Sequence, residues 1–269
     1  ADVCADDNAL VRACAEHGSL EFLQFLCDSF CLPGDDPARR MGIDSALAAA
    51  AAKGALPVVR FLASRYRVTL ADLRSNANAA LRMSAANGHT DVVAFLCEGW
   101  NLDDSDGRAD NNYALRHAAA HGHLCAVRYL HARFHLTSFD ARAEDNEALR
   151  RSAEGGHLHV VQFLCTTYGL DGLDGRSAHN HAFRACCANG HLAVAQLLHR
   201  RFRLTRSDAR SADNYALKFS AERGHLPVVA FLCETFGLTR KDVRSGNSHA
   251  EKYSGLNGHA DVVAYLRAH

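Results

Sequence analysis

Hydrophobic residues recur along this chain in a fixed order, and glycines mark the period. Successive marker glycines are 36 residues apart once and then 34 residues apart six times: Gly18, Gly54, Gly88, Gly122, Gly156, Gly190, Gly224 and Gly258. Seven residues before the glycine the residue is apolar in every copy except the last, which has Glu251. A constant period in this range predicts a solenoid of repeated units.

The residues that follow each glycine predict a second helix. Val92-Val93 and Phe95-Leu96 after Gly88 place apolar side chains at the i, i+3, i+4 spacing of a buried helical stripe. The glycine between the two apolar segments suits a helix C-cap. We therefore expect one solenoid over residues 1–269, with two short helices per repeat, at approximately 7–40, 43–76, 77–110, 111–144, 145–178, 179–212, 213–246 and 247–269.

The connectors between repeats share a second pattern. Twelve residues after the glycine comes an aromatic residue, which we interpret as core between repeats and not as a platform for nucleic-acid bases; the series is Phe30, Tyr66, Trp100, Phe134, Tyr168, Phe202 and Phe236. A Thr-x-x-Asp or Asp-x-x-Asp segment follows, as at Thr205 and Asp208. This spacing is typical of a capping box and predicts a short helical turn.

These residues resemble the ankyrin-repeat family. The clearest matches run from Tyr113 to Leu124 and from Tyr215 to Leu226, each with Ala-Leu, a cation, small residues and Gly-His-Leu. The chain departs from the family where x-Ala replaces Thr-Pro, where Arg or Lys follows the leucine, and where the unit has 34 residues. The resemblance implies an all-α, ankyrin-type α-solenoid with protein-binding activity. The departures favour short helical turns over the usual β-hairpins.

Charge and composition narrow the function. The 30 Lys and Arg residues balance the 30 Asp and Glu residues, which argues against a nucleic-acid partner because such binding generally needs a basic face. No apolar run approaches the roughly 20 residues that cross a bilayer. The first residues, Ala1 to Asp7, lack the pattern of a signal peptide. We expect an intracellular, cytoplasmic protein that is not inserted in a membrane.

Candidate binding residues lie on the first helices. A cation follows the core residue in most repeats, and we interpret this row as architecture, paired with Asp or Asn residues; a ladder for an acidic partner is the alternative. The next position varies between repeats, as do the residues before the glycine. In ankyrin repeats these positions line the concave face. By resemblance, the partner-binding candidates are Met83, Arg116, His117, Arg150, Arg151, Glu154, Phe219, Glu222, Arg223 and Tyr253.

The sequence contains no motif that indicates catalysis or a bound cofactor. The Phe-Leu-Cys cysteines recur two repeats apart, too far to share a disulfide or a zinc ion, so we expect no metal and no cofactor. Cys186 and Cys187 occupy inward-facing small positions near His191. We therefore expect a non-catalytic protein, monomeric on its own, that binds a partner protein through the concave first-helix face and the connector tips. The alternatives are a structural subunit of a large assembly and a substrate-recruiting arm of an enzyme complex.

Overall fold

The computed structural model describes residues 9–29 and 42–269, which form two compact units, 1–140 and 141–269. Each unit is described by itself. Within the described residues every regular element is helical, which confirms the all-α prediction. The division into two units leaves the expected single solenoid a prediction. Phe30, the first connector aromatic, lies outside the described residues.

The first unit contains the helices up to the boundary at Asp140. They are α1 (Ala9–His17), α2 (Leu20–Ser29), α3 (Ile43–Ala52), α4 (Leu56–Arg65), α5 (Leu70–Ala86), α6 (Thr90–Gly99), α7 (Asp104–Gly107), α8 (Ala109–Ala120) and α9 (Leu124–Arg133), with α10 (Ser138–Ala141) at the boundary itself. In this unit α5 packs against α3 and α8, so first helices contact first helices.

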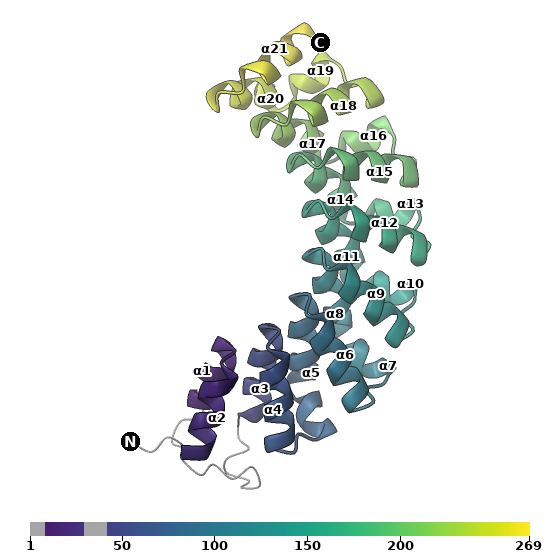
Figure 1. The fold of residues 1–269 in the computed structure, drawn as a ribbon. Coiled ribbons are helices and arrows are strands. Elements are labelled where there is room, and N and C mark those ends of the chain that lie inside the picture. Colours follow the sequence, from purple (N-terminus) through teal and green to yellow (C-terminus); the bar gives the residue numbers. More distant parts are fainter. Residues whose placement is uncertain (1–8, 30–41) are drawn as a thin grey trace. The chain divides into compact units, whose positions relative to one another are not determined.

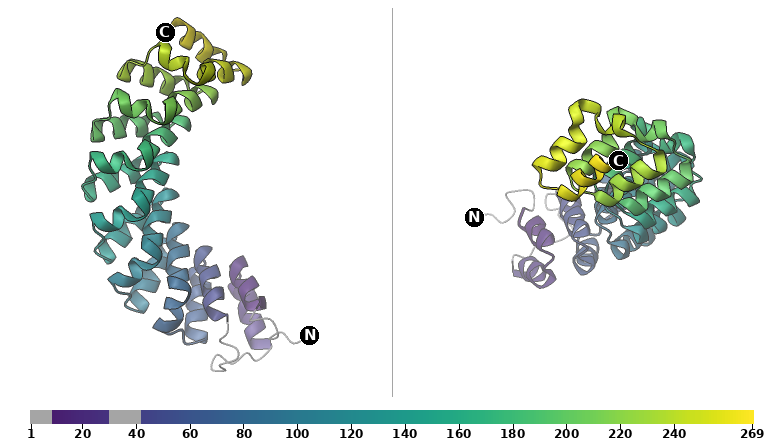
Figure 2. Two further views of the ribbon diagram at one scale, coloured as in Figure 1. Left: turned by 180° about the vertical axis from the view of Figure 1, so that it is seen from behind. Right: turned by 90° about the horizontal axis from the view of Figure 1, so that it is seen from above.

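The second unit repeats the same order. Its helices are α11 (Ala143–Glu154), α12 (Leu158–Thr167), α13 (Gly172–Gly175), α14 (Ser177–Ala188), α15 (Leu192–Phe202), α16 (Arg206–Ala209), α17 (Ser211–Glu222), α18 (Leu226–Phe236), α19 (Arg240–Val243), α20 (Ser245–Leu256) and α21 (Ala260–Ala268). Within each unit the first helices form one row and the second helices another (Figure 1, and from behind in Figure 2).

The predicted core positions are buried in both units. Leu115 and Leu149, which stand seven residues before their glycines, are fully buried, and so are the valine pairs of α4, α6, α12 and α18. Each such side chain stabilises the fold by about 1.5–3 kcal/mol. The connector aromatics Tyr66, Phe134 and Phe202 are also buried, which confirms that they belong to the core.

Several glycine turns are closed by a histidine from the next repeat, namely those at Gly54, Gly88, Gly156, Gly190 and Gly224. Gly190 has a φ of +82°, a left-handed conformation that favours glycine. The imidazole of His225 packs directly on it, since a Cβ at position 190 would lie 2.7 Å from His225 Nδ1. Glycine is therefore required there both for its backbone angle and for the close approach of the neighbouring repeat.

The connectors contain the predicted capping boxes. Asp208 Oδ2 accepts from the backbone N–H of Thr205 at 2.7 Å and from its hydroxyl at 2.9 Å. The same reciprocal arrangement opens the short helices at Asp103, Asp171 and Thr239. The helical turns predicted in place of β-hairpins are confirmed for these connectors.

A three-residue left-handed turn precedes most first helices, and no sequence pattern predicted it. Asp110, Asn111 and Asn112 have φ values of 54°, 52° and 61°, and Ala178, His179 and Asn180 repeat the geometry. Each non-glycine residue in this region costs roughly 1–2 kcal/mol, least for Asn and Asp. The surrounding structure must therefore hold the turn in place.

Candidate functional site

Two rows of arginines have their guanidinium groups engaged within the protein. In the connector row, Arg142 donates from Nε and Nη2 to the two carboxylate oxygens of Asp174 at 2.7 and 2.9 Å. Arg210 holds Asp242 with the same fork. Burial raises the pKa of Asp242, but the hydrogen bonds from Arg210 and from the Thr239 N–H outweigh it and lower the pKa to about 2.

The second row of arginines holds the left-handed turns. Arg150 donates from Nε to the carbonyl oxygen of Asp145 at 2.8 Å and from Nη2 to that of Glu144 at 2.9 Å. Arg116 makes the equivalent bonds in the first unit. Two other members of this row, Arg82 and Lys218, pair with Asp carboxylates as expected. Arg116 and Arg150 instead bond to the backbone oxygens of the turn. These two binding candidates thus stabilise a strained backbone segment.

In the second unit, side chains at positions that vary between repeats form an aromatic cluster. Its members are Tyr215, Phe219, His249 and Tyr253. Phe219 lies 4.3 Å from Tyr215 and 5.4 Å from His249, and the rings of His249 and Tyr253 are 4.3 Å apart, all measured between ring centroids. His249 Nε2 lies 2.7 Å from the Glu222 carboxylate. The structure thus brings the candidates Phe219, Glu222 and Tyr253 together.

The first unit carries a smaller set of these residues. His117 stacks on Tyr113 with a centroid distance of 3.8 Å. Arg82 covers the same tyrosine and also pairs with Asp110. Met83 is 37% exposed. Besides Arg116, the candidates of this unit are therefore one histidine stacked on a tyrosine and one exposed thioether.

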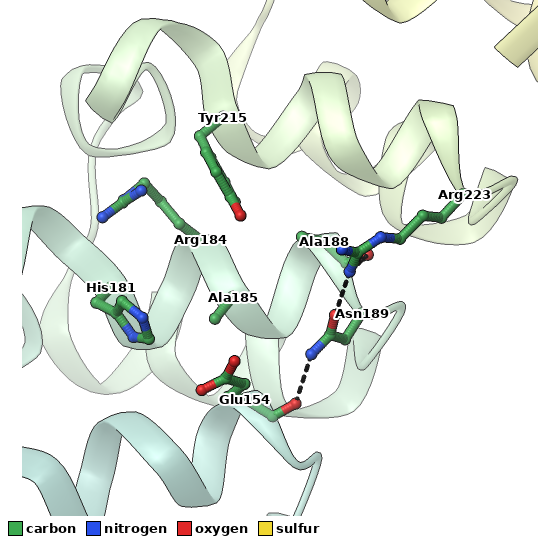
Figure 3. Close-up of a pocket in the computed structure, with 8 residues that line it drawn as sticks. All are labelled: Glu154, His181, Arg184, Ala185, Ala188, Asn189, Tyr215 and Arg223. Carbon is green, nitrogen blue, oxygen red and sulfur yellow. Dashed lines mark hydrogen bonds between the residues drawn. The ribbon is translucent and has the colours of Figure 1, made fainter. Parts of the chain in front are cut away.

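Of the three remaining candidates, Glu154 and Arg223 line one pocket in the second unit together with His181, Arg184 and Tyr215 (Figure 3). Its cavity volume is about 120 Å³. Arg151 lies beside it, and its Nη1 donates to Glu154 Oε2 at 2.8 Å. Sequence reasoning missed three of the lining or cluster residues: His181, Tyr215 and His249. All three occupy the position nine residues before a glycine, which varies between repeats and could have been read as a second variable row.

The buried thiols lack the environment of reactive cysteines. Burial raises the pKa of Cys97, Cys165 and Cys233 to about 12, whereas reactive thiols have lowered pKa values. Among the described residues no group of three or more His, Cys, Asp or Glu side chains could hold a metal ion. In the part of the chain that the structure describes, no helix is both long and apolar enough to cross a membrane.

Stacked helix pairs with a 34-residue period and glycine turns define a helical repeat protein. A family model described as ankyrin repeats (3 copies) matches residues 10–106 and again residues 81–175, which together exceed half of the chain. The chain belongs to the ankyrin-repeat family. An X-ray structure of an ankyrin repeat family protein from Legionella pneumophila is similar at 20% identity and a TM-score of 0.44, covering 93% of this chain and 78% of that one. No curated protein matches the chain.

Proposed function

We propose that this chain is a non-catalytic module that binds a partner protein through the first-helix face of its second unit. Ankyrin repeats are protein-binding modules, and the match of the family model supports this general role. The proposed face consists of the aromatic cluster, Arg151, Glu154 and Arg223. The observation that carries the proposal is the contrast between these varied, accessible side chains and the arginine rows, whose guanidinium groups are engaged internally.

The chemistry of the proposed face suits a binding hot spot. Aromatic and arginine side chains are enriched among the residues that dominate the energetics of protein interfaces, where they fill well-packed, desolvated pockets. Tyr253 is 38% exposed and the Arg151 side chain is 49% exposed, so both can contact another molecule. The His249–Glu222 contact and the contacts between the rings support a preorganised cluster, which reduces the entropy lost on binding.

The connector tips offer a second contact region. Phe139 in α10 is 83% exposed and Leu173 in α13 is 82% exposed. Both stand directly before the capping-box aspartate, where other connectors carry Ser105, Ser207 or Lys241. An exposed large apolar side chain at such a tip gains free energy when a partner covers it. We include these tips in the proposed function as secondary contacts.

Site-specific photo-crosslinking tests the proposed face. The amino acid p-benzoylphenylalanine is placed at position 253 in place of Tyr253, or at position 162 in place of Gln162, which is exposed on the second-helix row. We expect one defined protein from the native source to crosslink at position 253 and not at position 162. Crosslinking only at position 162 would contradict the proposal and favour a structural subunit held by its other face.

A further inference from the structure

The pocket of the second unit exists because two small residues stand where neighbouring repeats carry large ones. Ala185 occupies the position of Arg151 and Phe219, and Ala188 that of Glu154 and Glu222. Both alanines line the resulting cavity of about 120 Å³. The gap therefore depends on residue size at two registered positions, and it can admit the head of one side chain from a bound segment.

One wall of the pocket accepts hydrogen bonds. The Glu154 carboxylate points into the pocket from the end of α11 (Figure 3). Its backbone carbonyl accepts from Asn189 Nδ2 at 2.9 Å, and its Oε2 accepts from Arg151. The Arg151 contact orients the carboxylate, and the Asn189 contact fixes the backbone that carries it. Its charged oxygens retain lone pairs for a donor that enters the pocket.

The opposite wall donates hydrogen bonds. The Tyr215 hydroxyl points toward the side occupied by Glu154 (Figure 3). Arg223 donates from Nη1 to the carbonyl oxygen of Ala188 at 3.2 Å and to Asn189 Oδ1, while the rest of its guanidinium can serve an incoming acceptor. Arg184 donates to the carbonyl oxygens of His179 and Ala178, which fixes its stem at the edge of the pocket.

Charged groups of both signs line the pocket. A carboxylate entering the pocket would face Glu154, and an ammonium or guanidinium would face Arg223 and Arg184; like charges at such sites disfavour binding. Burial lowers the pKa of His181, so this side chain is neutral at pH 7 and adds no charge. The walls together fit an uncharged group that both donates and accepts.

We propose that this pocket binds the primary carboxamide of an asparagine or glutamine side chain in the bound segment of the partner. The amide NH₂ donates to the Glu154 carboxylate, and the amide oxygen accepts from the Tyr215 hydroxyl and Arg223. A carboxamide is the side-chain group that carries both functions in one planar head without net charge. The identity of the ligand as a protein segment rests on the proposed function, whereas the chemistry of the pocket does not.

A titration with small probes of similar size tests the chemistry directly. Propionamide, propionate and propylammonium are added separately at pH 7 to the full chain, and the NMR shifts of the Ala185, Ala188 and Asn189 backbone amides are followed. We expect propionamide to bind with a dissociation constant of about millimolar order, at least about tenfold below those of the two ions. Stronger binding of either ion, or no saturable shift with any probe, would overturn the inference. N-methylacetamide, which mimics the backbone, should bind more weakly because it has only one N–H.

Two substitutions that remove a charge and one that fills the pocket test the assignment of the two walls. Glu154→Gln should shift the preference toward propionate, and Arg223→Gln should shift it toward propylammonium. Ala185→Met should abolish all three responses while leaving the helical circular dichroism unchanged, because Met83 occupies the same register in another repeat. An unaltered probe preference in both charge variants would contradict the assignment of donor and acceptor walls.

The carboxamide-binding proposal and the proposed binding face can be rejected independently of each other. The probe titration needs no partner, so selective propionamide binding together with crosslinks only at position 162 would reject the binding face and retain the pocket chemistry. Crosslinks at position 253 together with no probe binding would retain the face and reject the carboxamide.

Discussion

Arginines in the second unit have two kinds of surroundings. In the connectors, Arg142 and Arg210 lock onto buried carboxylates, and the same fork recurs from repeat to repeat. On the first-helix face, Arg151 is half exposed beside Glu154, and the equivalent position in the next two repeats holds Ala185 and then Phe219. The connectors form the same arginine–aspartate pair in successive repeats, whereas the side chains on the first-helix face differ from one repeat to the next. We infer that repeated contacts build the fold and that varied ones are available for recognition.

The largest expected effect comes from a glycine turn. Gly190→Ala places a Cβ in a left-handed residue and against the His225 ring, so it should lower the free energy of unfolding by about 3 kcal/mol. The matched control is Gly169→Ala, which has a φ of +62° but nothing within 4 Å, and it should lose only about 1 kcal/mol. Urea denaturation measures both. Equal losses would show that histidine packing on the glycine contributes nothing.

The next largest loss of stability is expected from an arginine–aspartate pair that joins two successive connectors, which we call a rung. Asp208→Asn removes the charge that Arg176 grips at 2.9 and 2.8 Å and weakens the cap on the Thr205 N–H. We expect a loss of about 2–3 kcal/mol in the free energy of unfolding. Ser207→Ala, at the exposed neighbouring position, should change it by less than about 0.5 kcal/mol. A neutral Asp208→Asn variant would refute the structural role of the rungs.

Acid should weaken the same rungs. The folded-state pKa of Asp242 is about 2, below its ordinary value of 3.8, so the deprotonated form favours folding. This contribution of about 2 kcal/mol is fully present above pH 4 and is lost as the pH falls toward 2. Unfolding measured from pH 5 to pH 2 should show a smaller loss for Asp242→Asn than for the unaltered chain. Parallel curves would contradict the account.

Adjacent arginines on one helix give the smallest and most specific contrast. Arg150→Ala removes two bonds to the left-handed turn and should lower the free energy of unfolding by about 1–2 kcal/mol. Arg151→Ala removes an exposed ion pair and should change it by at most about 0.5 kcal/mol. Thermal melts of the two variants would provide the comparison. A larger loss for Arg151→Ala would reverse the assignment of the two positions.

Much of the fold follows from periodicity, because helix pairs, caps and core positions depend on local spacing. The burial of Phe134 and the capping box at Thr205 were predictable from single repeats. The left-handed turn at Asp110 was not, since Asp and Asn residues are compatible with several backbone states and the Arg116 bonds that hold the turn form only once the chain is folded.

The candidate site was predictable only where it depends on spacing along the sequence. The variable register revealed Phe219 and Tyr253 as neighbours in a row. The pocket depends on the small size of Ala185 and on the directions of Glu154 and Tyr215 across three helices, and no single repeat contains that information.

The most direct test compares partner affinity for two sets of substitutions in the second unit. One set replaces Arg151, Phe219, Arg223 and Tyr253 by Ala. The other replaces the second-helix residues Gln162, Thr166, Gln196 and Arg200 by Ala. The affinity for the partner identified by crosslinking is measured by calorimetric titration, and melting curves confirm that each variant is folded. We expect at least about 100-fold weaker binding for the first set and an unchanged affinity for the second. Equal affinities for the first set and the unaltered chain would contradict recognition through the first-helix face.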